Sequence, residues 1–142
     1  MLKRTRLKRK AKSELRKLKD TLWKLCRKII IEKYGNTCYC CGAKNLEGSN
    51  LHLGHFIPSS ICSAEMRYDL DNLKPCCYRC NIHLSGNWIE YEKHLKREKG
   101  QDFVEELKQR NENTKGKQYD TLWYQSKITE YEKLLITPLK KD

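Results

Sequence analysis

Four cysteines have the spacing of ligands to one metal ion. Cys38 and Cys41 form one Cys-x-x-Cys pair, and Cys77 and Cys80 form a second. Each pair can present two thiolates from a tight turn, and four thiolates complete the tetrahedral coordination of a structural zinc ion. Gly42 follows the first pair directly, which suits a turn that needs a positive φ angle. The spacing therefore predicts one structural Zn²⁺ held by Cys38, Cys41, Cys77 and Cys80.

Each pair also has a neighbouring cysteine that allows a different choice of ligands. Cys40 could serve in the first pair, and Cys76 with Cys80 would give a less usual Cys-x-x-x-Cys arrangement. We interpret these two thiols, together with Cys26 and Cys62, as small buried or half-buried side chains. Eight cysteines would suggest disulfides in a secreted protein, but this N-terminus lacks the apolar stretch of a secretory signal. No stretch is apolar enough for a membrane span either, so we expect a cytoplasmic protein with no membrane partner.

The segment between the two pairs is where chemistry could occur. It is 35 residues long, more than an ordinary structural zinc module needs, and it holds His52 and His55. A zinc ion with four thiolate ligands is closed to substrates. Any chemistry therefore belongs to the segment that the zinc would hold in place.

This segment and the residues after it contain a series of short motifs: His52-Leu53-Gly54-His55-Phe56, Arg67-Tyr68-Asp69, Asn72, and the run from Cys77 through Asn81 and His83 to Asn87. From about Thr37 to Leu95 the chain resembles an HNH (His-Me finger) nuclease. More narrowly, it is similar to the NinG/Rap recombination endonucleases of lambdoid bacteriophages. The resemblance implies a ββα-metal core, a catalytic divalent cation such as Mg²⁺, and hydrolysis of DNA, with a preference for branched DNA or recombination intermediates.

The resemblance also implies roles for three residues. His55 would be the general base that activates water, because an imidazole with a pKa near 6.5 is mostly neutral in the cytoplasm and can accept a proton. The cation would neutralise charge on the phosphorane and on the leaving oxygen. Asn72 matches the asparagine that fixes the loop and so orients the histidine. Asn81 stands where many HNH members have a ligand to the catalytic metal.

The residue before the general base departs from the common HNH pattern. Asp or His usually stands there as a metal ligand, whereas this chain has Gly54, as the NinG-like pattern does. Strand alternation places His52 on the Gly54 face and His55 on the other, so we expect His52 to join the site only if the strand is bulged. The candidates for the missing ligand are His52, His83, Asp69 and Asp71.

Local patterns predict the elements that would position these residues. A stripe of apolar residues, spaced by three and four, predicts an amphipathic helix that ends near Tyr34 and packs within its own chain. Its members are Leu15, Leu18, Leu22, Leu25 and Ile29. Residues 1–11 are charged without this periodicity, and we expect them to be disordered until a partner binds. Strands are predicted at 51–57 and 70–75, with a long loop at 58–69 between them.

The C-terminal half is predicted to be helical. One helix would begin near Trp88 and end at Gly100, and Asp102 with Glu105 suggests a capping box for a second, shorter one. A polar linker would follow at 111–117, and a last helix would stop near Pro138. We expect the larger aromatic side chains of this half to lie in the core rather than to stack on bases; they are Trp88, Tyr91, Trp123, Tyr124 and Tyr131.

The positive charge is concentrated at the N-terminus. Residues 1–34 hold 14 Lys and Arg but only three acidic residues, so they carry +11 of the formal +12. A segment of this kind attracts polyanions, of which nucleic acid is the commonest in a cell, although a solvated face kept for solubility is the simpler alternative. The residues expected to contact DNA phosphates are Lys3, Arg4, Arg6, Lys8, Arg9, Lys10 and Lys12.

Together these patterns predict a small α+β protein in three parts. A basic arm and helix (1–36) would precede a zinc-bound nuclease core (37–100), and a helical extension (101–142) would pack on that core. A zinc-containing DNA-binding module without catalysis is the main alternative, and a zinc-containing adaptor for another protein is a third. The sequence leaves open whether two chains pair as a homodimer to cut two strands.

Overall fold

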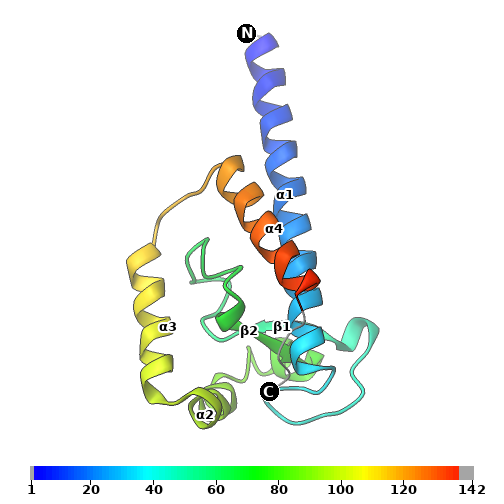
Figure 1. The fold of residues 1–142 in the computed structure, drawn as a ribbon, viewed down its shortest axis with the longest axis vertical. Coiled ribbons are helices and arrows are strands. Elements are labelled where there is room, and N and C mark those ends of the chain that lie inside the picture. The colour runs from blue at the N-terminus through cyan, green and yellow to red at the C-terminus, as the bar shows by residue number, and fades with distance from the viewer. Residues whose placement is uncertain (1, 138–142) are drawn as a thin grey trace.

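The structure is a computed structural model that describes residues 2–137 (Figure 1). It combines four α-helices with one small sheet, which confirms the predicted mixture of helix and sheet. The helices are α1 (Leu2–Tyr34), α2 (Trp88–Lys99), α3 (Gln101–Thr114) and α4 (Thr121–Ile136), and the strands are β1 (His52–His55) and β2 (Leu73–Cys76). The short helical turns are η1 (Gly48–Asn50), η2 (Leu70–Asn72) and η3 (Arg79–His83). The predicted stop at Pro138 lies outside the described residues.

The two strands form an antiparallel hairpin with a regular register. His52 pairs with Cys76 and His55 pairs with Leu73, and the residues between them pair in step. Both strands are shorter than predicted. After His55 the backbone of Ile57 bonds to the side chain of Asn72 instead of to a strand partner, so β1 ends there.

Each face of the hairpin is covered by its own hydrophobic cluster. Leu53 and Leu73 pack with buried residues of α1 and α4, and α4 lies along the C-terminal half of α1 (Figure 1). On the other face, the cysteine-rich turns pack with α2 and α3. The hairpin is therefore held between two layers, and side chains that leave it on opposite faces enter different environments.

Helix α1 is longer than predicted. Its C-terminal half buries Leu22, Cys26, Ile29 and Ile30 within the chain, which confirms the amphipathic stripe. Residues 2–14 are also helical but exposed, so the expected disorder of this segment is wrong for residues 2–11. Lys, Arg, Leu and Ala are good helix formers, and a helix that is already nucleated by packing extends through them at little cost.

The C-terminal helices follow the prediction in number but not in their boundaries. Gly100, at φ 93°, ends α2 and leads directly into α3 without a side-chain cap, so the capping box predicted at Asp102 is wrong. Helix α3 runs on to Thr114 through part of the predicted linker, because Asn111 is buried and accepts a hydrogen bond from the Ser63 backbone at 2.8 Å. Helix α4 is capped by the carboxylate of Asp120, which accepts from Trp123 N at 3.0 Å.

Candidate functional site

The four predicted zinc ligands meet at one place. The Sγ atoms of Cys38, Cys41, Cys77 and Cys80 all lie within 4.8 Å of one another, and that of Cys41 is 3.7 Å from that of Cys77. Zinc–sulfur bonds of ~2.3 Å give tetrahedral ligands a separation of about 3.8 Å. The arrangement can therefore hold a metal ion such as Zn²⁺.

Both turns are built to present their thiols. Gly42, at φ 79°, closes the first turn by donating from its backbone N to the Cys38 carbonyl at 2.9 Å, as its position predicts. In the second turn, the backbone N–H of Cys80 points at Cys77 Sγ, 3.4 Å away. Strand β2 ends at Cys76, and Tyr39 N donates to the Pro75 carbonyl at 2.8 Å. The four-cysteine site is thus connected directly to strand β2 of the hairpin.

Two of the remaining cysteines lie beside this site. Cys40 and Cys76 are buried, and their Sγ atoms are 3.9 Å apart. Both contact Cys38, so that Cys38, Cys40 and Cys76 form a second group of three converging thiols. Hydrogen bonds from Cys40 and Cys76 hold the pKa of the Cys38 thiol well below its ordinary value. Cys26 is buried and Cys62 half-buried, as predicted for thiols outside the zinc site.

The same sulfur atoms explain why residue 54 is glycine. A Cβ at position 54 would lie 2.5 Å from Cys76 Sγ, far inside van der Waals contact. Any larger residue would have to displace a thiol of the second group. The position at which HNH nucleases commonly carry a metal ligand is therefore closed to side chains here.

His55 stands at the end of β1 with its tautomer fixed. Its Nε2 lies 3.0 Å from the carbonyl oxygen of Arg67, and because a carbonyl only accepts, Nε2 must carry the proton. Nδ1 then keeps its lone pair, and no hydrogen bond to it occurs within residues 2–137. The ring stacks on Trp23 of α1, with centroids 5.4 Å apart. Burial lowers the pKa of His55 below its usual 6.5.

Asn72 fixes the loop that holds His55. Its side chain is fully buried and makes three hydrogen bonds: Oδ1 accepts from Ile57 N at 2.7 Å, and Nδ2 donates to the carbonyls of Ile57 and Met66 at 3.2 and 3.0 Å. Met66 directly precedes Arg67, whose carbonyl accepts from His55. Asn72 therefore joins both ends of the loop and sets the carbonyl that orients the histidine.

His52 and Asn81 meet on the other face of the hairpin. Nδ1 of His52 lies 3.0 Å from Nδ2 of Asn81, and Nε2 of His52 lies 2.8 Å from the Ser49 carbonyl. The strand is not bulged, so His52 stays on the face opposite His55, as strand alternation predicts. It reaches Asn81 because Asn81 itself lies on the Gly54 face, with Oδ1 3.7 Å from the position of a Cβ there.

The other three candidate ligands have different partners. Asp71 accepts a hydrogen bond from Arg110 at 2.8 Å. His83 is exposed at the end of η3, and its ring lies edge-to-face with that of Tyr78, with the ring centroids 5.2 Å apart. Asp69 accepts from Asp71 N at 2.9 Å and from Arg110 at 3.2 Å. Burial raises the pKa of Asp69, and Arg110 opposes that shift. The structure thus brings His52 to Asn81 but places His83 and Asp69 in other interactions.

A surface hollow opens beside His55. Two cationic side chains and one carboxylate border it, and the residues that line it are Lys19, Asp20, Trp23, His55, Ser59, Arg67 and Tyr68. Lys19 and Trp23 come from α1, whose part in this site the sequence did not predict. The only sequence signal was that Trp23 interrupts the charged face of the predicted helix. Helix α1 therefore supplies one wall of the histidine site.

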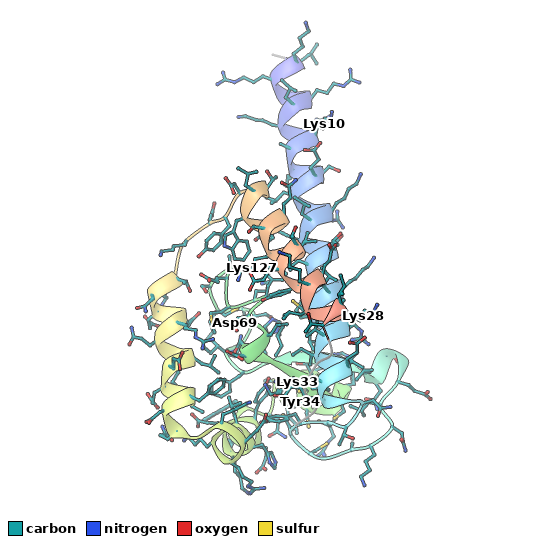
Figure 2. All side chains as sticks on the ribbon, viewed as in Figure 1. Lys10, Lys28, Lys33, Tyr34, Asp69 and Lys127 are labelled. Atoms are coloured by element: carbon teal, nitrogen blue, oxygen red, sulfur yellow. The ribbon has the colours of Figure 1, made fainter. Side chains whose placement is uncertain are left out.

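The seven basic residues of the arm (residues 1–12) are all exposed on α1. Figure 2 shows Lys10 on the part of α1 that extends beyond the rest of the chain. None of the seven forms an ion pair with a carboxylate in the part of the chain that the structure describes. Their charges are therefore available to a polyanion.

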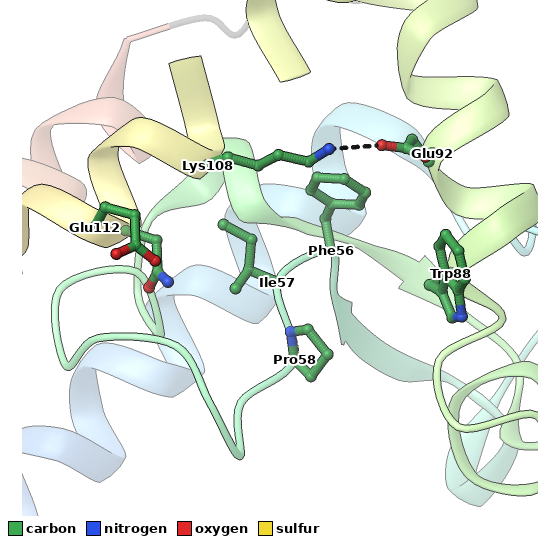
Figure 3. A pocket seen from close by; sticks show the side chains of 8 residues that line it. Phe56, Ile57, Pro58, Trp88, Glu92, Lys108 and Glu112 are labelled. Carbon is green, nitrogen blue, oxygen red and sulfur yellow. Dashed lines mark hydrogen bonds and ion pairs between the residues drawn. The ribbon is translucent and has the colours of Figure 1, made fainter. Parts of the chain in front are cut away.

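A second hollow, between the loop after β1 and helices α2 and α3, has a different character (Figure 3). Phe56, Ile57 and Trp88 border it, and a salt bridge of 3.1 Å joins Lys108 to Glu92. Trp88 is 58% exposed, so its predicted place in the core is wrong. Tyr91, Tyr124 and Tyr131 are buried as predicted, and Trp123 is half-buried. With Glu112 also on its rim, this hollow offers little attraction to phosphate.

Comparison with known proteins identifies one family. The model of the family described as Bacteriophage Lambda NinG protein matches residues 2–141, almost the whole chain. Neither the curated proteins nor the solved structures contain a significant match. Within residues 2–137 no helix is both long and apolar enough to cross a membrane.

Proposed function

Because the chain belongs to the bacteriophage lambda NinG family, we propose that it is an HNH-type endonuclease that cuts branched or recombination-intermediate DNA with a divalent cation. The observation that supports this most is the fixed tautomer of His55. Its Nε2–H is held by the Arg67 carbonyl, and Nδ1 is left as a base beside a hollow flanked by Lys19 and Arg67. A histidine that served only for packing would not need a fully buried asparagine to set its partner carbonyl.

In the proposed reaction, Nδ1 of His55 takes a proton from water while the water oxygen attacks the phosphorus of the scissile phosphodiester. The bond from phosphorus to the 3′ oxygen then breaks, and that oxygen leaves with the electron pair and takes a proton from solvent. The Arg67 carbonyl stabilises the imidazolium that forms, because Nε2 already donates to it. Lys19 and Arg67 are placed to attract the negatively charged phosphate. Asp20 borders the same hollow and limits the net positive charge there.

His52 and Asn81 are the residues proposed to hold the cation. The Nδ1 of His52 and the Oδ1 of Asn81 both carry lone pairs and lie on the Gly54 face, opposite the side chain of His55, and a cation such as Mg²⁺ held there would keep water on its other positions. The cation would neutralise charge on the phosphate and on the leaving oxygen where the DNA backbone passes the end of β1, between the two faces. Binding requires Asn81 to turn its oxygen toward His52 in place of Nδ2.

Incubation of the purified protein with labelled linear, nicked and four-way-junction DNA tests the proposal. We expect cleavage with Mg²⁺ or Mn²⁺, none with EDTA, and faster cleavage of the junction. The non-catalytic zinc module remains the alternative, supported by a four-thiol site and an exposed basic helix that do not depend on His55. Binding to all three substrates with no cleavage under any metal condition would favour that module.

The pH dependence follows from the burial of His55. Because burial lowers its pKa below 6.5, the neutral, proton-accepting form persists to a lower pH than for a free histidine. We expect kcat/KM at saturating Mg²⁺ to reach its plateau toward pH 8 and to fall to half of that plateau only below pH 6.5. Measurement between pH 5 and 8 checks this, and a half-maximal rate at pH 6.5 or above would contradict it.

Deletion of residues 2–12 tests the role of the arm. If several of its seven exposed cations neutralise phosphates, the truncated protein should bind duplex DNA more weakly. The slope of log K against log salt should also flatten by about 0.9 for each phosphate that the arm no longer neutralises. Fluorescence anisotropy from 50 to 300 mM salt measures both. An unchanged slope would show that the arm does not neutralise DNA phosphates and would favour the alternative that it serves solubility.

A further inference from the structure

Two thiols of the second group, Cys40 and Cys76, have no part in the proposed zinc site or in the reaction. Cys38, Cys40 and Cys76 are all buried, and their three Sγ atoms lie within 4.8 Å of one another. They come from the first cysteine turn and from the end of β2. Cys38 belongs to this group and to the four-cysteine group at once.

The spacing within the group is that of ligands rather than of a disulfide. Sγ of Cys40 and Sγ of Cys76 are 3.9 Å apart, close to the 3.7 Å between Cys41 and Cys77 in the four-cysteine site. A disulfide would require about 2.05 Å, whereas two thiolates on one zinc ion are separated by about 3.8 Å. The two groups thus have the same sulfur–sulfur geometry.

The surroundings offer a fourth donor and keep space for the sulfur atoms. The carbonyl oxygen of Gly86 lies 3.8 Å from Cys40 Sγ, at the separation of a neighbouring ligand. Gly54 leaves room for Cys76 Sγ that any Cβ would remove. The hydroxyl of Tyr91 donates to the Gly54 carbonyl at 3.0 Å and holds the glycine in that place.

Charge also favours a second ion. A zinc ion with four thiolates carries a net charge of −2, and Cys40 and Cys76 would then remain as neutral thiols. A second Zn²⁺ brings two positive charges and displaces the two thiol protons, so the buried region keeps the same net charge. Soft thiolate ligands select for such an ion over Mg²⁺.

We propose that this chain binds a second zinc ion through Cys38, Cys40, Cys76 and the Gly86 carbonyl, with the Cys38 thiolate bridging the two ions. The site is distinct from the single structural zinc and from the cation of the proposed reaction. Six of the eight cysteines would then be ligands of one dinuclear centre next to the hairpin.

Metal counting on the full-length protein tests the proposal. Protein loaded with excess Zn²⁺ and then desalted should retain two zinc ions per chain by elemental analysis and by native mass spectrometry. Cys40→Ala and Cys76→Ala should each retain one. Cys62→Ala is the matched control, because this half-buried thiol lies outside both groups, and it should retain two.

Cobalt substitution tests the bridge without any variant that could fail to fold. A titration with Co²⁺ should end at two equivalents, and the electron paramagnetic resonance signal per Co²⁺ should fall as the second equivalent binds, because a bridging thiolate couples the two ions. One zinc per chain in the parent protein, or a cobalt titration that ends at one equivalent, would overturn the proposal. Cys40 and Cys76 would then act only as hydrogen-bond donors to Cys38.

Discussion

Replacement of His55 by alanine is expected to slow DNA cleavage by about 10²- to 10⁴-fold, the usual contribution of a general base. The lone pair of Nδ1 is the base that the Arg67 carbonyl leaves available. Zinc content and DNA affinity should change little, since His55 belongs to neither cysteine group and not to the arm. Single-turnover cleavage at saturating protein measures the loss.

Three further variants make this result specific. His94→Ala removes another partly exposed histidine, which lies on α2 beside Glu90 at 3.6 Å, and it should cleave at the parental rate. Asn81→Ala should instead raise the Mg²⁺ concentration needed for half-maximal rate. Because the His55 ring packs on Trp23, His55→Gln should be measured as well, since it keeps most of the side-chain volume. Cleavage by His55→Gln at the parental rate would remove His55 from the mechanism.

Loss of the structural zinc is expected to have the largest effect on stability. Zinc binding contributes an apparent ~10 to 16 kcal/mol in small zinc-dependent folds at neutral pH, which rivals the whole stability of a domain. Cys41 is the best ligand to change because its side chain is exposed, so Cys41→Ser costs little packing. We expect Cys41→Ser to lose the zinc ion of the four-cysteine site and to unfold the hairpin region.

Thermal melting followed by circular dichroism, together with hydrogen exchange, checks this expectation. The amides of Gly54 and Tyr39, which lie in or against the hairpin, should lose their protection in Cys41→Ser. Cys62→Ser should melt like the parent protein. A Cys41→Ser protein with parental stability would show that the hairpin does not depend on metal.

The cluster of four cysteines and the general positions of the helices could be predicted because their signals are local. Two Cys-x-x-Cys pairs and a stripe of apolar residues carry their meaning within a few turns of chain. The role of His52 was harder to predict than that of Asn72. The loop contacts of Asn72 follow the motif, but the contact of His52 with Asn81 depends on which face of β1 the π-helical turn η3 covers, and strand alternation alone does not give that.

Long-range contacts account for most of what the sequence did not predict. Trp23 stacks on His55 although 32 positions of the chain separate them, and Asn111 anchors Ser63 from within the predicted linker. The second thiol group was hidden because Cys40 and Cys76 are 36 residues apart and look like ordinary core residues. The helical arm was missed because a charged stretch without periodicity resembles disorder, although its residues are good helix formers.

Helix α1 runs without interruption from the basic arm to the wall of the histidine site, so it sets a fixed distance between the two. An α-helix rises 1.5 Å per residue, so Lys10 and Trp23 are held about 20 Å apart along its axis. That length corresponds to roughly six nucleotides of a DNA strand at 3.4 Å each. If the arm binds one phosphate of a DNA strand, this distance would determine which phosphate of that strand lies beside His55. Insertion of one whole helical turn after Lys12 would move the basic side chains by ~5.4 Å along the helix axis, about one and a half nucleotides. The basic side chains would still point in nearly the same direction around the axis.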